Sequence, residues 1–226
     1  MNTVTIDGIS DVVCPWCFIG KRHLETALRQ FHQEFPETTA PKVRWLPFQL
    51  NPDLPREGVS RKSYLEEKFG GPERAREIYA RVSQAGQDAG IDFDFERMTV
   101  QPNTLDAHRL IHAAGTLDKQ DVMVETLFQA YFLEGANLTQ IHTLAALAQR
   151  AGFGVHEAET YLAGDEDRPL VDSLDHRARQ MGISGVPFFI FNGKYALSGA
   201  QPPEIILQVL RRVHSDPSPM LSAVAP

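Results

Sequence analysis

The chain holds two cysteines, and the fifteen residues around them, DVVCPWCFIGKRHLE, limit the folds that it can adopt. Residues 3–13 are rich in β-branched side chains and predict a strand directly before Cys14. Residues 18–35 place apolar side chains on one face of a helix, and residues 42–50 predict a second strand. The first fifty residues therefore favour a β-α-β unit, with Cys14 and Cys17 where the first strand turns into the helix.

The middle of the chain carries helical patterns. A segment rich in proline and charge begins at residue 51, and six helices are predicted after it, over 60–69, 72–90, 103–114, 119–133, 139–151 and 155–163. We find no strand pattern and no internal repeat in this block. Mixed structure then returns, with helices over 169–182 and 203–213 and two β segments between them. Asn192-Gly193 joins these β segments and predicts a two-residue hairpin, because both residues tolerate positive φ.

Without the helical block, the order of elements is β-α-β followed by α-β-β-α, which is the order of a thioredoxin fold. We therefore predict an α/β protein, a thioredoxin-like fold with an inserted all-helical domain. The expected thioredoxin-like domain is discontinuous and comprises residues 1–50 and 167–215, and the insertion comprises 51–166. Residues 216–226 are expected to form a disordered tail.

Composition excludes several classes of partner. The 226 residues include 22 basic and 29 acidic side chains, a net charge of −7, which argues against nucleic acid or an anionic membrane surface as the main partner. No apolar run reaches the length of a transmembrane helix. The first residues show no secretory signal, so we predict a cytoplasmic location. The sequence leaves the oligomeric state open.

A Cys-x-x-Cys pair at the start of a helix has a chemical use. Unpaired N–H groups and the positive end of the helix dipole favour the thiolate of Cys14. Cys14 can then attack a disulfide, and Cys17, one turn on, can resolve the mixed disulfide. Pro15 suits the first helical turn, and Trp16 offers an apolar surface that a partner polypeptide can cover. This chemistry needs the redox-active disulfide Cys14–Cys17 and no tightly bound cofactor.

Three other interpretations of the pair compete with this one. A structural zinc site needs four ligands; a second cysteine pair is absent, and His23 does not complete the set, so we predict no metal. Two inert buried thiols are also compatible with the spacing. A binding or chaperone module that has kept the scaffold is the non-enzymatic alternative. The strand–CxxC–helix context favours redox chemistry over all three.

Pro187 in SGVPFF stands just before a β segment. A cis peptide bond there would turn the carbonyl and N–H of Val186 toward Cys14, where an extended substrate could pair with them. On this segment alone, a trans proline that begins a strand is the simpler interpretation.

Four stretches together resemble the DsbA-like thioredoxin superfamily, and the FrnE-type cytoplasmic dithiol oxidoreductases within it: DVVCPWCFIGKRHLE, NTLDAHRLIHAA, YFLEGANLT and ISGVPFFIFNGKYALSGAQPPE. The resemblance implies a redox pair at Cys14 and Cys17, a cis Pro187, and protein or peptide substrates that carry thiols or disulfides. This sequence departs from the periplasmic DsbA pattern: that pattern has Pro-His between the cysteines, whereas this chain has Pro15-Trp16. Because Trp16 has no charge to offer a thiolate, we predict a milder couple, which acts as a disulfide isomerase or reductase as readily as an oxidase.

A neighbouring branch supplies the alternative function. Kappa-class glutathione transferases and 2-hydroxychromene-2-carboxylate isomerases share the fold and the insertion, bind glutathione, and usually carry serine where this chain has Cys14. The alternative is therefore a glutathione-dependent transferase or isomerase. Both cysteines favour dithiol chemistry here and leave glutathione open as a co-substrate.

Three further residues are candidates for the site. Asp11, three residues before Cys14, is either a proton relay to Cys17 or a carboxylate at the end of a strand. His108 is expected to face the cysteine pair, because NTLDAHRL matches the related branch. Asn103 either caps its helix or lines the cleft.

Overall fold

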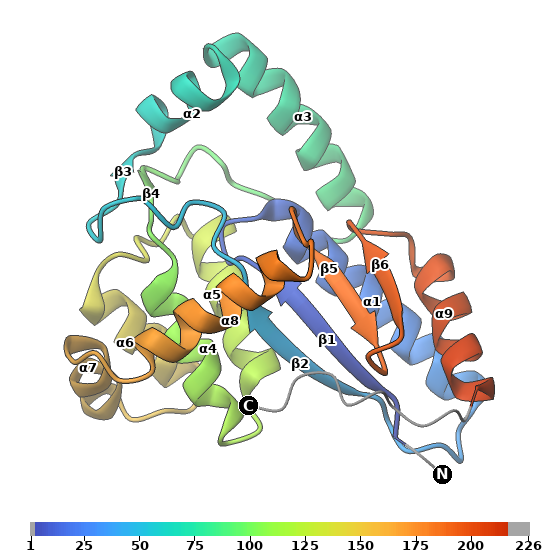
Figure 1. Cartoon of the computed structure of the whole chain (residues 1–226). Helices are drawn as coiled ribbons and strands as arrows, with labels where there is room; N and C mark the ends of the chain where they lie inside the picture. Colours follow the sequence, from blue (N-terminus) through green and yellow to red (C-terminus); the bar gives the residue numbers. More distant parts are fainter. Residues whose placement is uncertain (1–2, 217–226) are drawn as a thin grey trace.

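The computed structural model describes residues 3–216 of the chain. Its central sheet has four strands in the order β2-β1-β5-β6 (Figure 1). β1 pairs in parallel with β2, whereas β5 is antiparallel to both β1 and β6. The strands are β1 Thr5–Ser10, β2 Lys42–Pro47, β5 Phe188–Phe191 and β6 Tyr195–Ser198. This sheet confirms the predicted thioredoxin-like topology.

Helices cover both faces of the sheet. α1 (Pro15–Glu34) and α9 (Pro203–Ser215) pack against each other, and α8 (Arg168–Gln180) contacts β2. Side chains of β5 point alternately to the two faces of the sheet, and each face packs against a different hydrophobic core. Phe189 and Phe191 belong to the large core that also holds the apolar side chains of α1 and α9, whereas Phe188 and Ile190 pack against a small core formed with α8.

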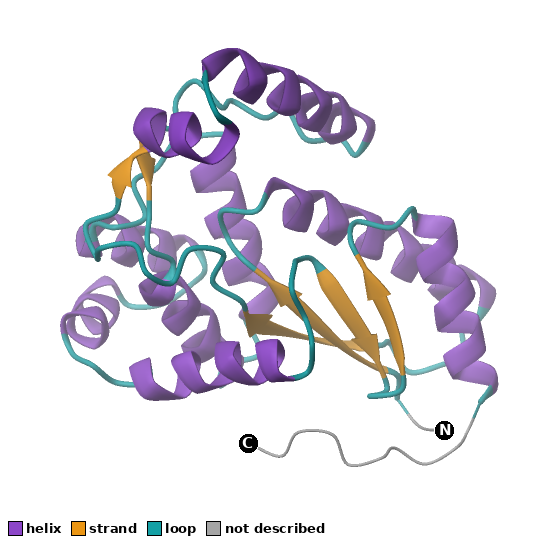
Figure 2. Cartoon of the chain, turned by 45° about the horizontal axis from the view of Figure 1, so that its top comes forward, coloured by secondary structure: helices purple, strands orange, loops and turns teal. Residues whose placement is uncertain are grey.

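The helical block lies between β2 and α8. Its six helices are α2 Arg61–Phe69, α3 Pro72–Asp88, α4 Leu105–Gly115, α5 Gln120–Phe132, α6 Ile141–Arg150 and α7 Val155–Ala163. α4 and α5 pack on β2, whereas α2 and α3 form an arch above the rest of the molecule, and α3 contacts α1 (Figures 1 and 2). The prediction that this block has no strand is wrong. β3 (Val59–Ser60) and β4 (Val100–Gln101) form an antiparallel pair, and strands of two residues are too short to show alternation.

Three local predictions can be compared with the structure. β5 and β6 form the predicted hairpin, with φ of 49° and 65° at Asn192 and Gly193, but its loop has three residues, 192–194, and not two, because Phe191 pairs with Tyr195. The Asn192 Oδ1 accepts a 2.7 Å hydrogen bond from the Thr5 N–H. α1 begins at Pro15 rather than at residue 18, so Cys17 lies inside its first turn. β2 ends at Pro47 rather than at residue 50, because proline cannot donate to a strand ladder.

The predicted tail mostly falls outside the described residues, which end at Asp216. The Asp216 carboxylate accepts a 2.8 Å hydrogen bond from the Tyr195 hydroxyl. Within residues 3–216, every helix is too short or too polar to cross a membrane. The exact domain boundaries stay a prediction.

Candidate active site

The cysteine pair lies at the carboxyl end of β1, on the first turn of α1. Cys14 caps the helix with an extended backbone, φ −95° and ψ 109°. Its carbonyl accepts hydrogen bonds from the N–H groups of Cys17, at 3.0 Å, and Phe18, at 3.4 Å. Its own N–H donates to the Asp11 carbonyl at 3.0 Å. Both cysteines are free thiols in this structure, and this turn places them on one helical end.

The two thiols differ in environment. Cys14 is 5% exposed, whereas Cys17 is completely buried. Burial raises the pKa of the Cys17 thiol well above its ordinary value, and the hydrogen bond and charge of Cys14 raise it further. The backbone of Asp11 and the Ser10 hydroxyl act in the opposite direction, and both lower the pKa of Cys17. The outer cysteine is therefore the one that a substrate can reach, and the inner one is held as a thiol.

Pro187 faces the pair across the site. The Val186–Pro187 peptide bond is cis, as the resemblance implied. The Cys14 Sγ lies 3.5 Å from the Val186 carbonyl oxygen and donates a hydrogen bond to it. Pro15 is half-buried beside them, and Trp16 is 43% exposed. The site thus presents a sulfur, a backbone carbonyl and an exposed aromatic side chain together.

The side chains of Asp11 and His108 contact each other, and both are buried, whereas the expectation that His108 faces the cysteine pair stays a prediction. The Asp11 Oδ2 accepts a 2.7 Å hydrogen bond from the Leu50 N–H, and its Oδ1 lies 3.3 Å from the His108 Nε2. The Asp11 carboxylate therefore contacts Leu50, just after β2, and His108 of α4, while the backbone of Asp11 interacts with Cys17. The proton relay from Asp11 to Cys17 stays a prediction.

Asn103 ties two segments of the insertion together. Its Oδ1 accepts from the N–H of Leu105, the first residue of α4, at 3.0 Å. Its Nδ2 donates to the carbonyls of Pro52 and Leu54, at 3.3 and 2.8 Å. Asn103 thus supports the start of α4 and holds the linker after β2. A direct role of Asn103 in the cleft stays a prediction.

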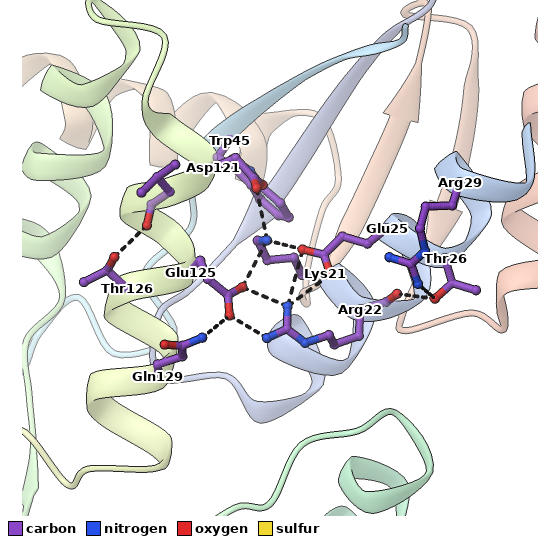
Figure 3. Close-up of polar contacts among 11 residues, drawn as sticks. Lys21, Arg22, Glu25, Thr26, Arg29, Trp45, Asp121, Glu125, Thr126 and Gln129 are labelled. Carbon is purple, nitrogen blue, oxygen red and sulfur yellow. Dashed lines mark hydrogen bonds and ion pairs between the residues drawn. The ribbon is translucent and has the colours of Figure 1, made fainter. Parts of the chain in front are cut away.

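A buried lysine, which the sequence analysis missed, joins α1 to the insertion (Figure 3). Lys21 Nζ lies 3.2 Å from an Asp121 oxygen and 3.1 Å from a Glu125 oxygen, both on α5, and it also pairs with Glu25. Trp45 Nε1 donates to Asp121 at 3.0 Å, so β2 also contacts this cluster between α1 and α5. No spacing rule identifies such a residue, because a lysine four positions after Cys17 is usually solvent-exposed.

Across residues 3–216, no group of three His, Cys, Asp or Glu side chains is arranged to hold a metal ion. His23, the residue considered as a further zinc ligand, places its Nδ1 3.0 Å from the Gln201 carbonyl oxygen.

The family follows from comparison with known proteins. A family model described as the DSBA-like thioredoxin domain matches residues 5–211. The chain belongs to this family. Among solved structures, this DSBA-like protein is similar to a probable DsbA oxidoreductase from Streptomyces coelicolor. The two are 26% identical with a TM-score of 0.86, over 98% of this chain and 94% of the other.

Two more distant structures share the fold of this DSBA-like protein. The cytosolic disulfide reductase DsbM from Pseudomonas aeruginosa, in a structure with glutathione, has a TM-score of 0.64 and 19% identity over 94% of this chain and all of the other. A 2-hydroxychromene-2-carboxylate isomerase has a TM-score of 0.67 and 16% identity over 93% of this chain and 96% of the other. These two likenesses show the fold alone, and the family rests on the matching family model.

Proposed function

We propose that the protein is a thiol–disulfide oxidoreductase that uses Cys14 as nucleophile and Cys17 as resolving thiol. The Cys14 thiolate attacks a substrate disulfide, forms a mixed disulfide and releases one substrate sulfur as a thiol. Cys17 then attacks Cys14, and the second substrate sulfur leaves as a thiol. The substrate gains two electrons and two protons, and the enzyme ends as the Cys14–Cys17 disulfide. The reverse sequence oxidises a dithiol.

The observation that carries this proposal is the division of labour between the two sulfurs. Of the two cysteines, only Cys14 has any exposure to solvent, and its Sγ lies 3.5 Å from the Val186 carbonyl oxygen. Cys17 is completely buried one turn away. An extended substrate that pairs with the backbone of Val186 would bring its disulfide to Cys14 and not to Cys17. Exposed Trp16 adds apolar contact area beside the same point.

Protein or peptide disulfides are the proposed substrates, and the cytoplasm is the proposed location. Glutathione is proposed as the reductant that returns the oxidised pair to two thiols, which the DsbM structure with glutathione makes reasonable for this fold. A glutathione-dependent transferase or isomerase is the rival function, which the isomerase neighbour supports only at the level of the fold.

The test is catalysed reduction of insulin disulfides, driven by dithiothreitol and, separately, by glutathione. We expect turnover by the wild type and none by Cys14→Ser. Cys17→Ser should accumulate a mixed disulfide on Cys14, visible as a mass increase equal to the substrate thiol less two hydrogens. Absence of reduction by the wild type, together with glutathione-dependent conversion of a small electrophile or chromene carboxylate, would replace this proposal with the rival function.

A further inference from the structure

Gly20 occupies a position in α1 where glycine has a cost. It lies inside the helix and is buried, and glycine is disfavoured in helix interiors because it loses the most backbone entropy on folding. A Cβ at this position would lie 2.9 Å from Pro187 Cγ, 3.4 Å from Pro187 Cβ and 3.5 Å from Phe189 Cε2. The first distance is too short for two carbon atoms. The helix therefore approaches Pro187 as closely as a bare backbone allows.

The neighbours cannot give way easily. Pro187 is a rigid ring in a buried position, and Phe189 is completely buried in the large core. A side chain at Gly20 must therefore separate α1 from the segment that leads into β5 by some tenths of an ångström. Overpacking of this kind is relieved by backbone shifts because interiors are close-packed.

The same two segments carry the reacting groups. Cys14 begins α1, Val186 precedes Pro187, and the Cys14 Sγ lies 3.5 Å from the Val186 carbonyl oxygen. We propose that Gly20 is a positioning residue, whose missing side chain sets the gap between the Cys14 sulfur and the Val186 carbonyl and so aligns a substrate backbone with the attacking sulfur. This inference rests on the proposed oxidoreductase function.

Gly8 provides a matched control. A Cβ there would lie 2.9 Å from two ring carbons of Trp45 and 3.5 Å from Phe189 Cε1. The predicted overlap is as severe as at Gly20 and reaches the same Phe189. It falls on β1 and Trp45, however, and not on Pro187. Gly8→Ala and Gly20→Ala therefore share the overpacking and differ in the contact with the redox site.

The experiment compares these two variants by steady-state kinetics with a peptide disulfide and by the rate of Cys14 alkylation with iodoacetamide. We expect Gly20→Ala to lower kcat/KM about tenfold, mainly through KM, because misplacement of about 1 Å can cost 10²-fold and the shift here is smaller. Alkylation of Cys14 should become at least about threefold faster, because the thiol loses its acceptor and gains exposure. Gly8→Ala should stay within about twofold of wild type in both.

A double-mutant cycle covers the case in which Gly20→Ala folds poorly. Pro187→Ala removes the ring carbon that the new Cβ meets, so Gly20→Ala should have little further effect in that background. Equal effects of Gly20→Ala in both backgrounds, or equal effects of Gly20→Ala and Gly8→Ala in an active wild type, would overturn the inference. A wild type without disulfide exchange would instead refute the proposed function, and the alkylation rates would still test Gly20.

Discussion

The packing of α1 against α5 of the insertion includes one buried lysine, Lys21, and we predict that its replacement by methionine lowers the free energy of unfolding. The Lys21 side chain is 2% exposed and pairs with Glu25, Asp121 and Glu125. Burial alone would lower the pKa of Lys21, but the three carboxylates outweigh it and raise the pKa above its ordinary value. Lys21 is thus charged at neutral pH, and Lys21→Met leaves three carboxylates without their shared cation.

The magnitude follows from how much water each carboxylate keeps. Removal of one partner from a buried ion pair typically costs about 3–5 kcal/mol. Asp121 and Glu25 retain 58% and 30% of their side-chain exposure, and Arg22 still donates to Glu125 at 2.9 Å. We therefore expect Lys21→Met to lower the free energy of unfolding by about 2–3 kcal/mol, a fall in Tm of roughly 4–12 °C for a chain of this size.

Urea unfolding at pH 7 measures this difference, with an unchanged m-value as the check that the same transition is compared. The control is Arg150→Met, which breaks a 2.8 Å pair with Glu134 whose side chains are 43% and 47% exposed. This control should cost less than about 1 kcal/mol. The reasoning is refuted if Lys21→Met costs no more than Arg150→Met.

The same cluster predicts the sign of an acid effect. Burial raises the pKa of Glu125, but the Arg22 hydrogen bond and the charge of Lys21 outweigh it, so its pKa lies below the ordinary 4.5. A lowered carboxyl pKa stabilises the fold above the unfolded value, and that stability is lost as pH falls through the folded value. Because Lys21→Met reduces this contribution, its difference from wild type should shrink below about pH 4.5.

Two other predictions concern Cys17 and Arg109. Burial raises the pKa of Cys17 and persists in the mixed disulfide, so the attack of Cys17 on Cys14 should accelerate about tenfold per pH unit from pH 6 to 8. Rapid-quench kinetics of the mixed disulfide measure this rate, and a plateau by pH 7 would contradict the prediction. Arg109 is completely buried and donates to Asp106 and to the carbonyls of Tyr161, Gly164 and Glu166. Arg109→Met should cost about 3–5 kcal/mol in urea unfolding, and a cost as small as that of Arg150→Met would contradict this role.

The parts of the fold that the sequence predicted correctly depend on local patterns. β-Branched residues before Cys14, apolar spacing after it and the Asn192-Gly193 pair each act over a few neighbours, so the order of elements and the hairpin could be read directly. α1 begins three residues before the position that apolar spacing predicts, because Pro15 and Trp16 are not part of that spacing. Their place in the helix is set by the capping geometry of Cys14.

The contacts of the buried polar residues join distant segments, which local sequence patterns do not show. His108 approaches Asp11 across 97 positions, and only the resemblance placed it near the pair. Lys21 and Arg109 are charged residues in helices, which composition rules assign to the surface, and both are buried because their partners come from other elements. Gly20 looks like a tolerated helix glycine until Pro187 is placed against it.

Gly20 and Lys21 are neighbours in sequence and lie about 100° apart around α1, so they contact different parts of the molecule. Gly20 faces Pro187 and Phe189, whereas Lys21 faces α5, where the Phe18 and Phe128 rings also stack with centroids 4.9 Å apart. The redox helix is therefore held on one side by the segment that presents Val186 and on another by the insertion. The first contact lies next to Val186, whose carbonyl is 3.5 Å from the Cys14 sulfur, so under the proposed role of Gly20 a change at position 20 should alter KM, whereas a change at position 21 should alter stability.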